Sequence, residues 1–250
     1  VKKRCPAGLR GEKEPVRPEK REKTGLGKKK ELVRPAESEK TEEIREKEVP
    51  CGSERGKRGR ETREVSEGGE KMQKILIVVD MQNDFVSGVL GTQEAFDIVP
   101  NVVGRVVDAL NRGETVLFTR DTHEPDYLST QEGKHLPVPH CIRGTEGWEI
   151  VEQLRPASAG QAILDKPSFG SAELGRLLAE ENEKELIEKV TLIGLCTDIC
   201  VISNALLVKA FLPEAEVAVD AACCAGVTQE SHRTALAAMK SCQITVEHEA

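Results

Sequence analysis

Three residues that together could perform nucleophilic catalysis follow short apolar segments of the chain. Asp80, Lys166 and Cys200 each lie at the end of such a segment or about one turn beyond it. Apolar segments of this kind predict buried strands, and the carboxyl ends of parallel strands meet at one edge of a sheet. We therefore expect a carboxylate, an ammonium and a thiol to converge on one crevice, where they could serve as base, charge stabiliser and nucleophile.

Each of these residues also has a simpler interpretation. Cys200 lies near the start of a predicted helix, where a thiol has a lowered pKa and backbone N–H groups could hold an oxyanion, but a buried inert cysteine fits the position equally well. Asp80 could be a base whose pKa is tuned by burial and a nearby cation, or a carboxylate that caps a loop. Lys166 could be a solvated charge at the rim of the sheet. The three residues together favour catalysis more than any one of them alone.

A second group of residues could bind a metal. Asp121 and His123 are two residues apart and face the same way on an extended segment, and His140 follows in the same polar stretch. Carboxylate and imidazole ligands suit Zn, Fe or Mn, and three protein ligands leave positions open for water or substrate. The alternative is that these are solvated loop histidines. Cys141 adjoins His140, but adjacent side chains seldom share one metal, so we do not count it as a ligand.

The order of the apolar segments predicts an α/β fold. Strand-like segments alternate with segments whose apolar residues recur at helical spacing, which is typical of a three-layer sandwich with a mostly parallel sheet flanked by helices. The predicted strands are 74–80, 115–119, 161–164, 190–195, 216–220 and 244–247. The predicted helices are 98–110, 172–189, 198–210 and 229–240. Between them, the polar stretch 122–148 is long enough that we expect a functional loop.

Charge and aromatic content separate the chain into two parts. The chain has 250 residues and a formal net charge of −7, yet residues 1–71 hold 22 Lys and Arg against 16 Glu and no aromatic residue. We expect 1–71 to be a disordered charged tail because it cannot bury enough apolar surface. The alternatives are a segment that binds nucleic acid or a membrane surface, or an assigned start that lies upstream of the true one at Met72. Residues 72–250 are acidic and long enough to build a sizeable core.

The composition also disfavours several classes of protein. An acidic folded part argues against nucleic-acid binding. No stretch approaches the ~20 apolar residues of a membrane span, and the start shows no apolar run of a secretory signal. Eight irregularly spaced cysteines do not resemble a secreted disulfide framework and indicate free thiols in a reducing compartment. We expect a cytoplasmic protein that acts on a small molecule, without nucleic acid or membrane.

Five short segments carry most of the residues singled out above. They are VVDMQNDF (78–85), TRDTH (119–123), PVPHCIRGTEGW (137–148), DKPSFGS (165–171) and GLCTDICV (194–201). In this order and spacing they resemble the isochorismatase-like cysteine hydrolases, in particular the nicotinamidase-related amidases. The resemblance covers 72–250 and implies one isochorismatase-like hydrolase domain, which in this family commonly forms a homo-oligomer.

The resemblance also implies a role for individual residues. It implies a catalytic triad of Asp80, Lys166 and Cys200 and a divalent metal, with zinc as the first choice and iron or manganese as alternatives. It implies a cis peptide bond before Cys196, which would turn the N–H of Cys196 toward that of Cys200 and complete an oxyanion hole. The residues implied for the metal are Asp121, His123 and His140, and those left for the walls of a substrate pocket are Phe85 and Phe169.

The activity implied by the resemblance is that of a metal-assisted cysteine amidohydrolase, and our first hypothesis is conversion of nicotinamide to nicotinate and ammonia through a thioester. Two departures weaken nicotinamide specifically. Pro137 stands where nicotinamidases often carry Trp, and the polar stretch 122–148 offers only Asp126-Tyr127 where many have a further His. The alternatives are hydrolysis of another small amide or carbamoyl compound, and a non-catalytic or redox-sensing member. The potential metal ligands argue against the isochorismatase branch, which needs no such metal.

Overall fold

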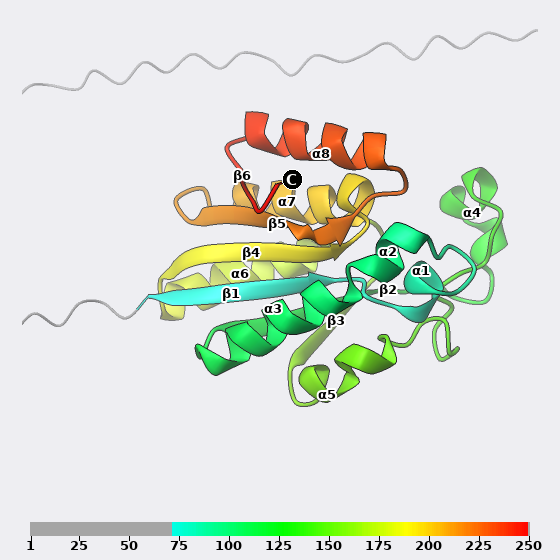
Figure 1. The fold of residues 1–250 in the computed structure, drawn as a ribbon, viewed down its shortest axis with the longest axis horizontal. Coiled ribbons are helices and arrows are strands. Elements are labelled where there is room, and N and C mark those ends of the chain that lie inside the picture. Colours follow the sequence, from blue (N-terminus) through cyan, green and yellow to red (C-terminus); the bar gives the residue numbers. More distant parts are fainter. Residues whose placement is uncertain (1–71, 250) are drawn as a thin grey trace, which may run out of the picture. The chain divides into compact units, whose positions relative to one another are not determined.

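Six parallel strands form the centre of the computed structural model, which describes residues 72–249 (Figure 1). Their order is β3-β2-β1-β4-β5-β6, so the chain builds outward from β1 on one side and returns to place β4 on the other. The strands are β1 (Gln73–Val79), β2 (Thr115–Asp121), β3 (Ala162–Lys166), β4 (Ile187–Leu195), β5 (Glu216–Ala225) and β6 (Thr245–Glu247). The expectation of a disordered tail over 1–71 lies outside the described residues.

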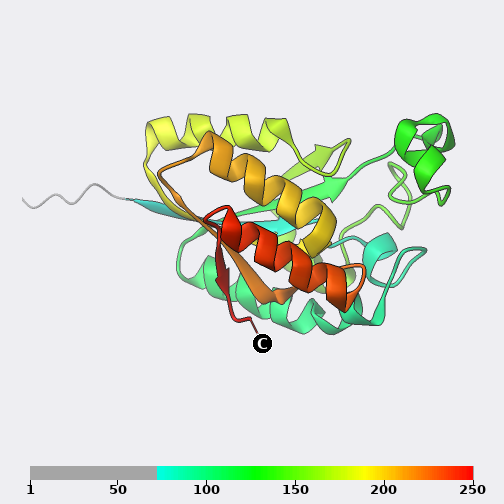
Figure 2. The same ribbon diagram turned by 90° about the horizontal axis from the view of Figure 1, so that it is seen from above.

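Helices cover both faces of this sheet, which confirms the predicted three-layer α/β sandwich (Figures 1 and 2). Each face has its own hydrophobic core. The helices on one face are α6 (Ala172–Lys184), α7 (Ile202–Phe211) and α8 (Gln229–Ser241), and those on the other are α2 (Gln93–Asp97), α3 (Val99–Asn111) and α5 (Arg155–Ser158). None of the helices in the described part of the chain is long and apolar enough to cross a membrane.

Strand β1 is buried on both faces because every residue of its apolar run has a core to enter. Successive side chains of a strand point to opposite faces. Ile75, Ile77 and Val79 pack into the core beneath α6, α7 and α8, whereas Leu76 and Val78 pack into the core beneath α3. This explains why a continuous apolar run, rather than an alternating one, predicted a central parallel strand.

The boundary between α6 and β4 differs from the prediction. The predicted helix 172–189 ends at Lys184, and β4 begins at Ile187 instead of residue 190. Ile187 is buried and pairs with Gln73 of β1, and its N–H donates to Asn182 Oδ1 at 2.8 Å. Pairing across the sheet therefore outweighs the local helical spacing.

Several elements near the carboxyl edge of the sheet were also mispredicted. The stretch 122–148 is not a plain loop, since it contains the 3₁₀ turn η1 (Tyr127–Ser129) and the short helix α4 (Gln131–His135). The predicted helix 198–210 is divided into a π-helical turn, η3 (Thr197–Val201), and α7. Four further elements were not predicted: α1 (Asn83–Val86) and α2 lie between β1 and α3, and η2 (Glu152–Leu154) and α5 lie between β2 and β3. Strands β2, β3 and β5 extend beyond their predicted ends.

Candidate active site

The carboxyl edge of the sheet brings the predicted residues together where the strand order reverses. Asp80 directly follows β1, and Cys200 lies in the turn η3 that follows the neighbouring strand β4. Lys166 and Asp121 are the last residues of β3 and β2, and they are register partners. All four side chains are buried. Residues separated by up to 120 positions thus meet at the switch point, where open α/β sheets bind their ligands.

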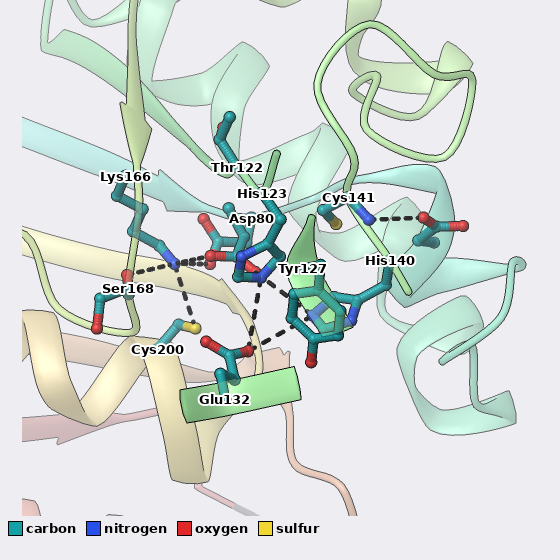
Figure 3. Close-up of polar contacts among 12 residues, drawn as sticks. Asp80, Thr122, His123, Tyr127, Glu132, His140, Cys141, Lys166, Ser168 and Cys200 are labelled. Atoms are coloured by element: carbon teal, nitrogen blue, oxygen red, sulfur yellow. Dashed lines mark hydrogen bonds and ion pairs between the residues drawn. The ribbon is translucent and has the colours of Figure 1, made fainter. Parts of the chain in front are cut away.

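Lys166 lies at the centre of the proposed triad (Figure 3). Its Nζ is 2.7 Å from Asp80 Oδ2 and 3.4 Å from Cys200 Sγ, and it donates to the Ser168 carbonyl at 3.1 Å. The side chains of Lys166 and Asp80 are both inaccessible to solvent. A carboxylate, an ammonium and a thiol therefore form one buried contact group, as predicted from the strand ends.

The electrostatics of this group differ from the sequence-based expectation at Cys200. Burial, together with the charge of Asp80, raises the pKa of the thiol well above its ordinary value, although Lys166 acts in the opposite direction. The predicted lowering of this pKa by a helix N-terminus is therefore wrong for the free site. Burial also raises the pKa of Asp80, against the opposing charge of Lys166. For Lys166, burial opposes protonation, but the negative charges of Asp80, Cys200 and Asp121 together outweigh burial and raise the pKa of the ammonium.

Thr119 is a contact of the triad that sequence analysis missed. Its Oγ1 donates to Asp80 Oδ1 at 2.7 Å, and the Asp80 backbone has a positive φ of 48°. This hydrogen bond lowers the pKa of Asp80, against the larger effect of burial. Thr119 lies in β2 next to β1, so only the sheet order reveals the contact.

A second group of side chains lies beside the triad and includes all three predicted metal ligands. Asp121, His123 and His140 are joined by Glu132, and their ligand atoms all lie within 4.8 Å of one another. Glu132 comes from α4 and was not among the predicted ligands. Sequence analysis missed Glu132 because nothing in the sequence distinguishes it from the other carboxylates of this stretch, and only α4 turns it toward the histidines. The local clue to α4 was Thr130, a helix-capping residue whose Oγ1 accepts from Gly133 N at 3.0 Å.

The imidazoles are oriented as metal ligands require. His140 Nδ1 donates to the Val138 carbonyl at 2.8 Å, which leaves Nε2 free to face Asp121 and Glu132. His123 Nε2 is buried and lies 2.9 Å from Asp121 Oδ2, yet no described residue gives it a satisfactory hydrogen bond. The Tyr127 ring packs against both imidazoles, with centroids 4.6 Å and 5.1 Å away. A buried, unsatisfied ring nitrogen beside two carboxylates fits a divalent cation.

Asp121 carries a full negative charge between the two groups. Burial opposes this charge, but the neighbouring imidazoles and the Lys166 ammonium outweigh burial and hold the pKa of Asp121 below its usual value. Its Oδ1 lies 3.3 Å from Lys166 Nζ. The same carboxylate therefore belongs to the triad's surroundings and to the metal group.

A cavity of about 300 Å³ opens onto both groups. Cys200 and Asp121 line it, and so do the two residues predicted as pocket walls, Phe85 and Phe169. Leu136, rather than its neighbour Pro137, contributes to the wall. Much of the remaining lining is apolar and comes from Leu90, Ala95, Leu195, Ile199 and Val227.

The turn that holds Cys200 has the backbone geometry implied by the resemblance. The Leu195–Cys196 peptide bond is cis, which confirms that expectation, and Cys196 lines the cavity together with Cys200. Asn204, which was not predicted, fixes this turn from α7. Its Nδ2 donates to the carbonyls of Cys200 at 2.8 Å and Phe169 at 3.0 Å, so one buried amide ties the turn to a wall of the cavity.

Comparison with known proteins places this arrangement in a family. The isochorismatase domain family matches residues 74–250. The uncharacterized isochorismatase family protein PncA of Bacillus subtilis (strain 168) is 30% identical over 174 residues, which are 66% of this chain and 93% of that protein. The crystal structure of nicotinamidase/pyrazinamidase PncA from Bacillus subtilis matches with a TM-score of 0.63 at 29% identity and covers 71% of this chain and 100% of the other.

A further solved relative contains a metal. The pyrazinamidase of Pyrococcus horikoshii in complex with zinc matches with a TM-score of 0.57 at 27% identity and covers 70% of this chain and 98% of that one. The family match spans all five segments that carried the resemblance, and the fold agrees with it. This chain belongs to the isochorismatase family.

Proposed function

We propose that this protein is a metal-assisted cysteine amidohydrolase that converts nicotinamide to nicotinate and ammonia. The observation that carries the proposal is the contact of Asp80, Lys166 and Cys200 at the wall of a cavity that also borders a four-residue metal group. Its similarity to the nicotinamidase/pyrazinamidase of Bacillus subtilis and to the pyrazinamidase of Pyrococcus horikoshii supports an amide substrate.

In the first half of the reaction, Cys200 Sγ attacks the carbonyl carbon of the amide. Because burial raises the pKa of the thiol, Cys200 starts as a neutral thiol, and the Asp80 carboxylate, which is paired with the Lys166 ammonium, takes its proton as the C–S bond forms. The backbone N–H groups of Cys196 and Cys200 hold the oxyanion. Asp80 then gives its proton to the departing nitrogen, and ammonia leaves a thioester on Cys200.

In the second half, water attacks the thioester carbonyl and Asp80 accepts its proton. The C–S bond breaks, the proton returns to the sulfur, and the carboxylic acid product is released. Lys166 remains an ammonium throughout, since the raised pKa keeps it charged, and it offsets the negative charges of Asp80 and Asp121.

The metal group contributes to substrate binding. A divalent metal held by Asp121, His123, Glu132 and His140 would supply a Lewis-acid position beside the cavity that orients a substrate heteroatom. Zinc is the first choice because two imidazoles and two carboxylates suit it and a relative was solved with it, and iron and manganese are the alternatives.

The cavity favours an uncharged substrate. Among the described residues that line it, the charged side chains are Asp121 and Glu132, and no Lys or Arg is present. An anionic substrate, such as an N-carbamoyl amino acid, would find no Lys or Arg among these lining residues to pair with its carboxylate. The planar ring of nicotinamide instead suits the apolar walls formed by Phe85 and Phe169.

Ammonia release from a small panel of amides tests the proposal. The panel holds nicotinamide, an uncharged aliphatic amide and an N-carbamoyl amino acid, and the enzymes are the unaltered chain, Cys200→Ala, and Cys242→Ala as a control at an exposed thiol. We expect release from nicotinamide that Cys200→Ala abolishes and Cys242→Ala retains. Release that survives Cys200→Ala would refute the nucleophile, and release from the carbamoyl compound alone would favour the alternative substrate class.

The cellular compartment and the oligomeric state of the enzyme are also proposals. We propose a cytoplasmic enzyme that assembles as a homo-oligomer. The six cysteines in the described part of the chain are all free, which supports a reducing compartment. The molar mass of the protein in solution, measured by light scattering, tests the homo-oligomer, and the mass of a single chain would contradict it.

A further inference from the structure

Three consecutive residues of the VVDMQNDF segment have no part in the chemistry above, yet each contacts the segment that carries His140. We call residues 138–149 the metal loop. Gln82, Asn83 and Asp84 all hydrogen-bond to it through their side chains. Capping of α1 does not explain these contacts, because its N-cap residue, Gln82, makes no side-chain capping hydrogen bond. The three side chains therefore need another role.

Gln82 hydrogen-bonds to the backbone of the predicted metal ligand Asp121. Its side chain is fully buried, Oε1 accepts from Asp121 N at 2.7 Å, and Nε2 donates to the Asp121 carbonyl at 2.9 Å. The second Nε2 hydrogen reaches the Trp148 carbonyl of the metal loop at 2.8 Å. One amide thus uses all its donors to fix the end of β2 and the end of the metal loop relative to each other.

Asp84 holds the other end of the metal loop. Its Oδ2 accepts from Cys141 N at 2.8 Å, and Cys141 has a positive φ of 45° directly after His140. The Cys141 carbonyl in turn accepts from His123 N at 3.0 Å. Gly147 leaves room for this carboxylate, because a Cβ at Gly147 would lie 2.2 Å from Asp84 Oδ2. Asp84 therefore fixes the backbone directly after His140, and the backbone of His123 through one further hydrogen bond.

We propose that Gln82 and Asp84 are positioning residues that hold the metal ligands in place before a cation binds. The inference rests on the metal group of the proposed function. Partners that orient metal ligands typically contribute about 10–100-fold to metal affinity. Asn83 makes an exposed side-chain contact to the same loop, with Nδ2 donating to the Glu146 carbonyl at 2.8 Å, but it touches no ligand or its neighbour. It therefore serves as a matched control.

Zinc affinity of the full chain tests the proposal without any measurement of turnover. The zinc Kd is measured by competition with a chromogenic chelator for the unaltered chain and for Gln82→Met, Asp84→Ala, Asp84→Asn and Asn83→Ala. We expect Gln82→Met and Asp84→Ala to raise the Kd about 10–100-fold. Asp84→Asn keeps an oxygen that can accept from Cys141 N, so its Kd should stay near that of the unaltered chain, as should that of Asn83→Ala.

Circular dichroism establishes which variants fold. If Gln82→Met does not fold, the zinc Kd values of Asp84→Ala and Gly147→Ala test the proposal instead. Gly147→Ala leaves Asp84 in the chain but displaces its carboxylate, because the added Cβ would clash with it. An unchanged Kd in folded Asp84→Ala, or an equal loss in Asn83→Ala, would overturn the proposal. An unaltered chain that binds no zinc would overturn the metal group together with this inference, whereas the amide panel tests the triad separately.

Discussion

Lys166 and Asp121 join the two halves of the site: Lys166 Nζ lies 3.3 Å from Asp121 Oδ1, while Asp121 Oδ2 lies 2.9 Å from His123 Nε2. The same ammonium contacts Asp80 at 2.7 Å. One cation therefore balances a carboxylate of the triad and a carboxylate of the metal group. A change in the charge of either group acts on the other through this contact.

Replacing Lys166 should reveal how strongly this contact holds the site together. Lys166→Met keeps most of the volume but leaves Asp80 and Asp121 buried without their cation. Removing one partner of a buried ion pair typically costs about 3–5 kcal/mol. We expect a loss of this order in urea unfolding, with Lys184→Met, at an exposed ion pair, as a control that changes little. An unchanged unfolding free energy in Lys166→Met would show that the buried pair does not stabilise the fold.

Asp80→Asn should nearly abolish turnover while the protein stays folded. Asparagine has the same shape but cannot accept the proton of Cys200 or of the attacking water. A general acid–base group typically contributes about 10²–10⁴-fold to the rate. Ammonia release from nicotinamide measures the loss, and the double variant with Cys200→Ala should be no slower than Cys200→Ala alone because the two groups act as a unit.

The acid limb of the pH profile should follow Asp80. Because burial raises the pKa of this carboxyl above its ordinary 3.8, the base is lost at a higher pH than an ordinary carboxylate as the pH falls. Thr119→Val removes a hydrogen bond that lowers this pKa, so the acid limb of kcat/KM should move to higher pH. Thr119→Ser keeps the hydroxyl and should leave the limb in place; an identical shift in both variants would contradict this role for the hydroxyl.

Glu132 should contribute to metal affinity although the sequence did not point to it. Glu132→Gln removes a charged ligand, so the zinc Kd should rise, and His123→Ala should raise it further because it removes the buried ring nitrogen that lacks another partner. Glu124→Gln is the matched control, since this carboxylate is exposed and pairs with Arg143 outside the group. Equal affinities for Glu132→Gln and the unaltered chain would exclude Glu132 as a ligand.

Two glycines should respond to alanine in opposite directions. Gly194, just before the cis peptide bond, has a φ of +113°, and a Cβ there would lie 2.1 Å from the Val79 carbonyl oxygen. Backbone strain of this kind costs about 1–3 kcal/mol before the clash is counted, so Gly194→Ala should lower the unfolding free energy by at least that much. Gly104 lies inside α3 with open space around it, so Gly104→Ala should stabilise the protein by about 0.5–1 kcal/mol. Thermal or urea unfolding of the two variants measures both effects.

The amino-acid sequence by itself determined the class of fold and pointed to the members of the proposed triad. The apolar run that ends at Asp80 removes all its side chains from water only if both faces of the strand are buried, so it specified a central parallel strand. The alternation of strand-like and helical segments specified the sandwich. Because parallel strands share one carboxyl edge, Asp80, Lys166 and Cys200 could be brought together without knowledge of the strand order.

Only the tertiary structure decided which side chains complete and tune this site. Thr119 reaches Asp80 because β2 is the neighbour of β1, and Glu132 joins the metal group because α4 turns it inward. Gln82 acts on Asp121 through hydrogen bonds to its backbone, which leave no pattern in residue types. The pKa of Cys200 even moves opposite to the sequence-based expectation. The physical reason is that burial and contacts between distant segments are properties of the packed chain, whereas periodicity and spacing report only what a segment does locally.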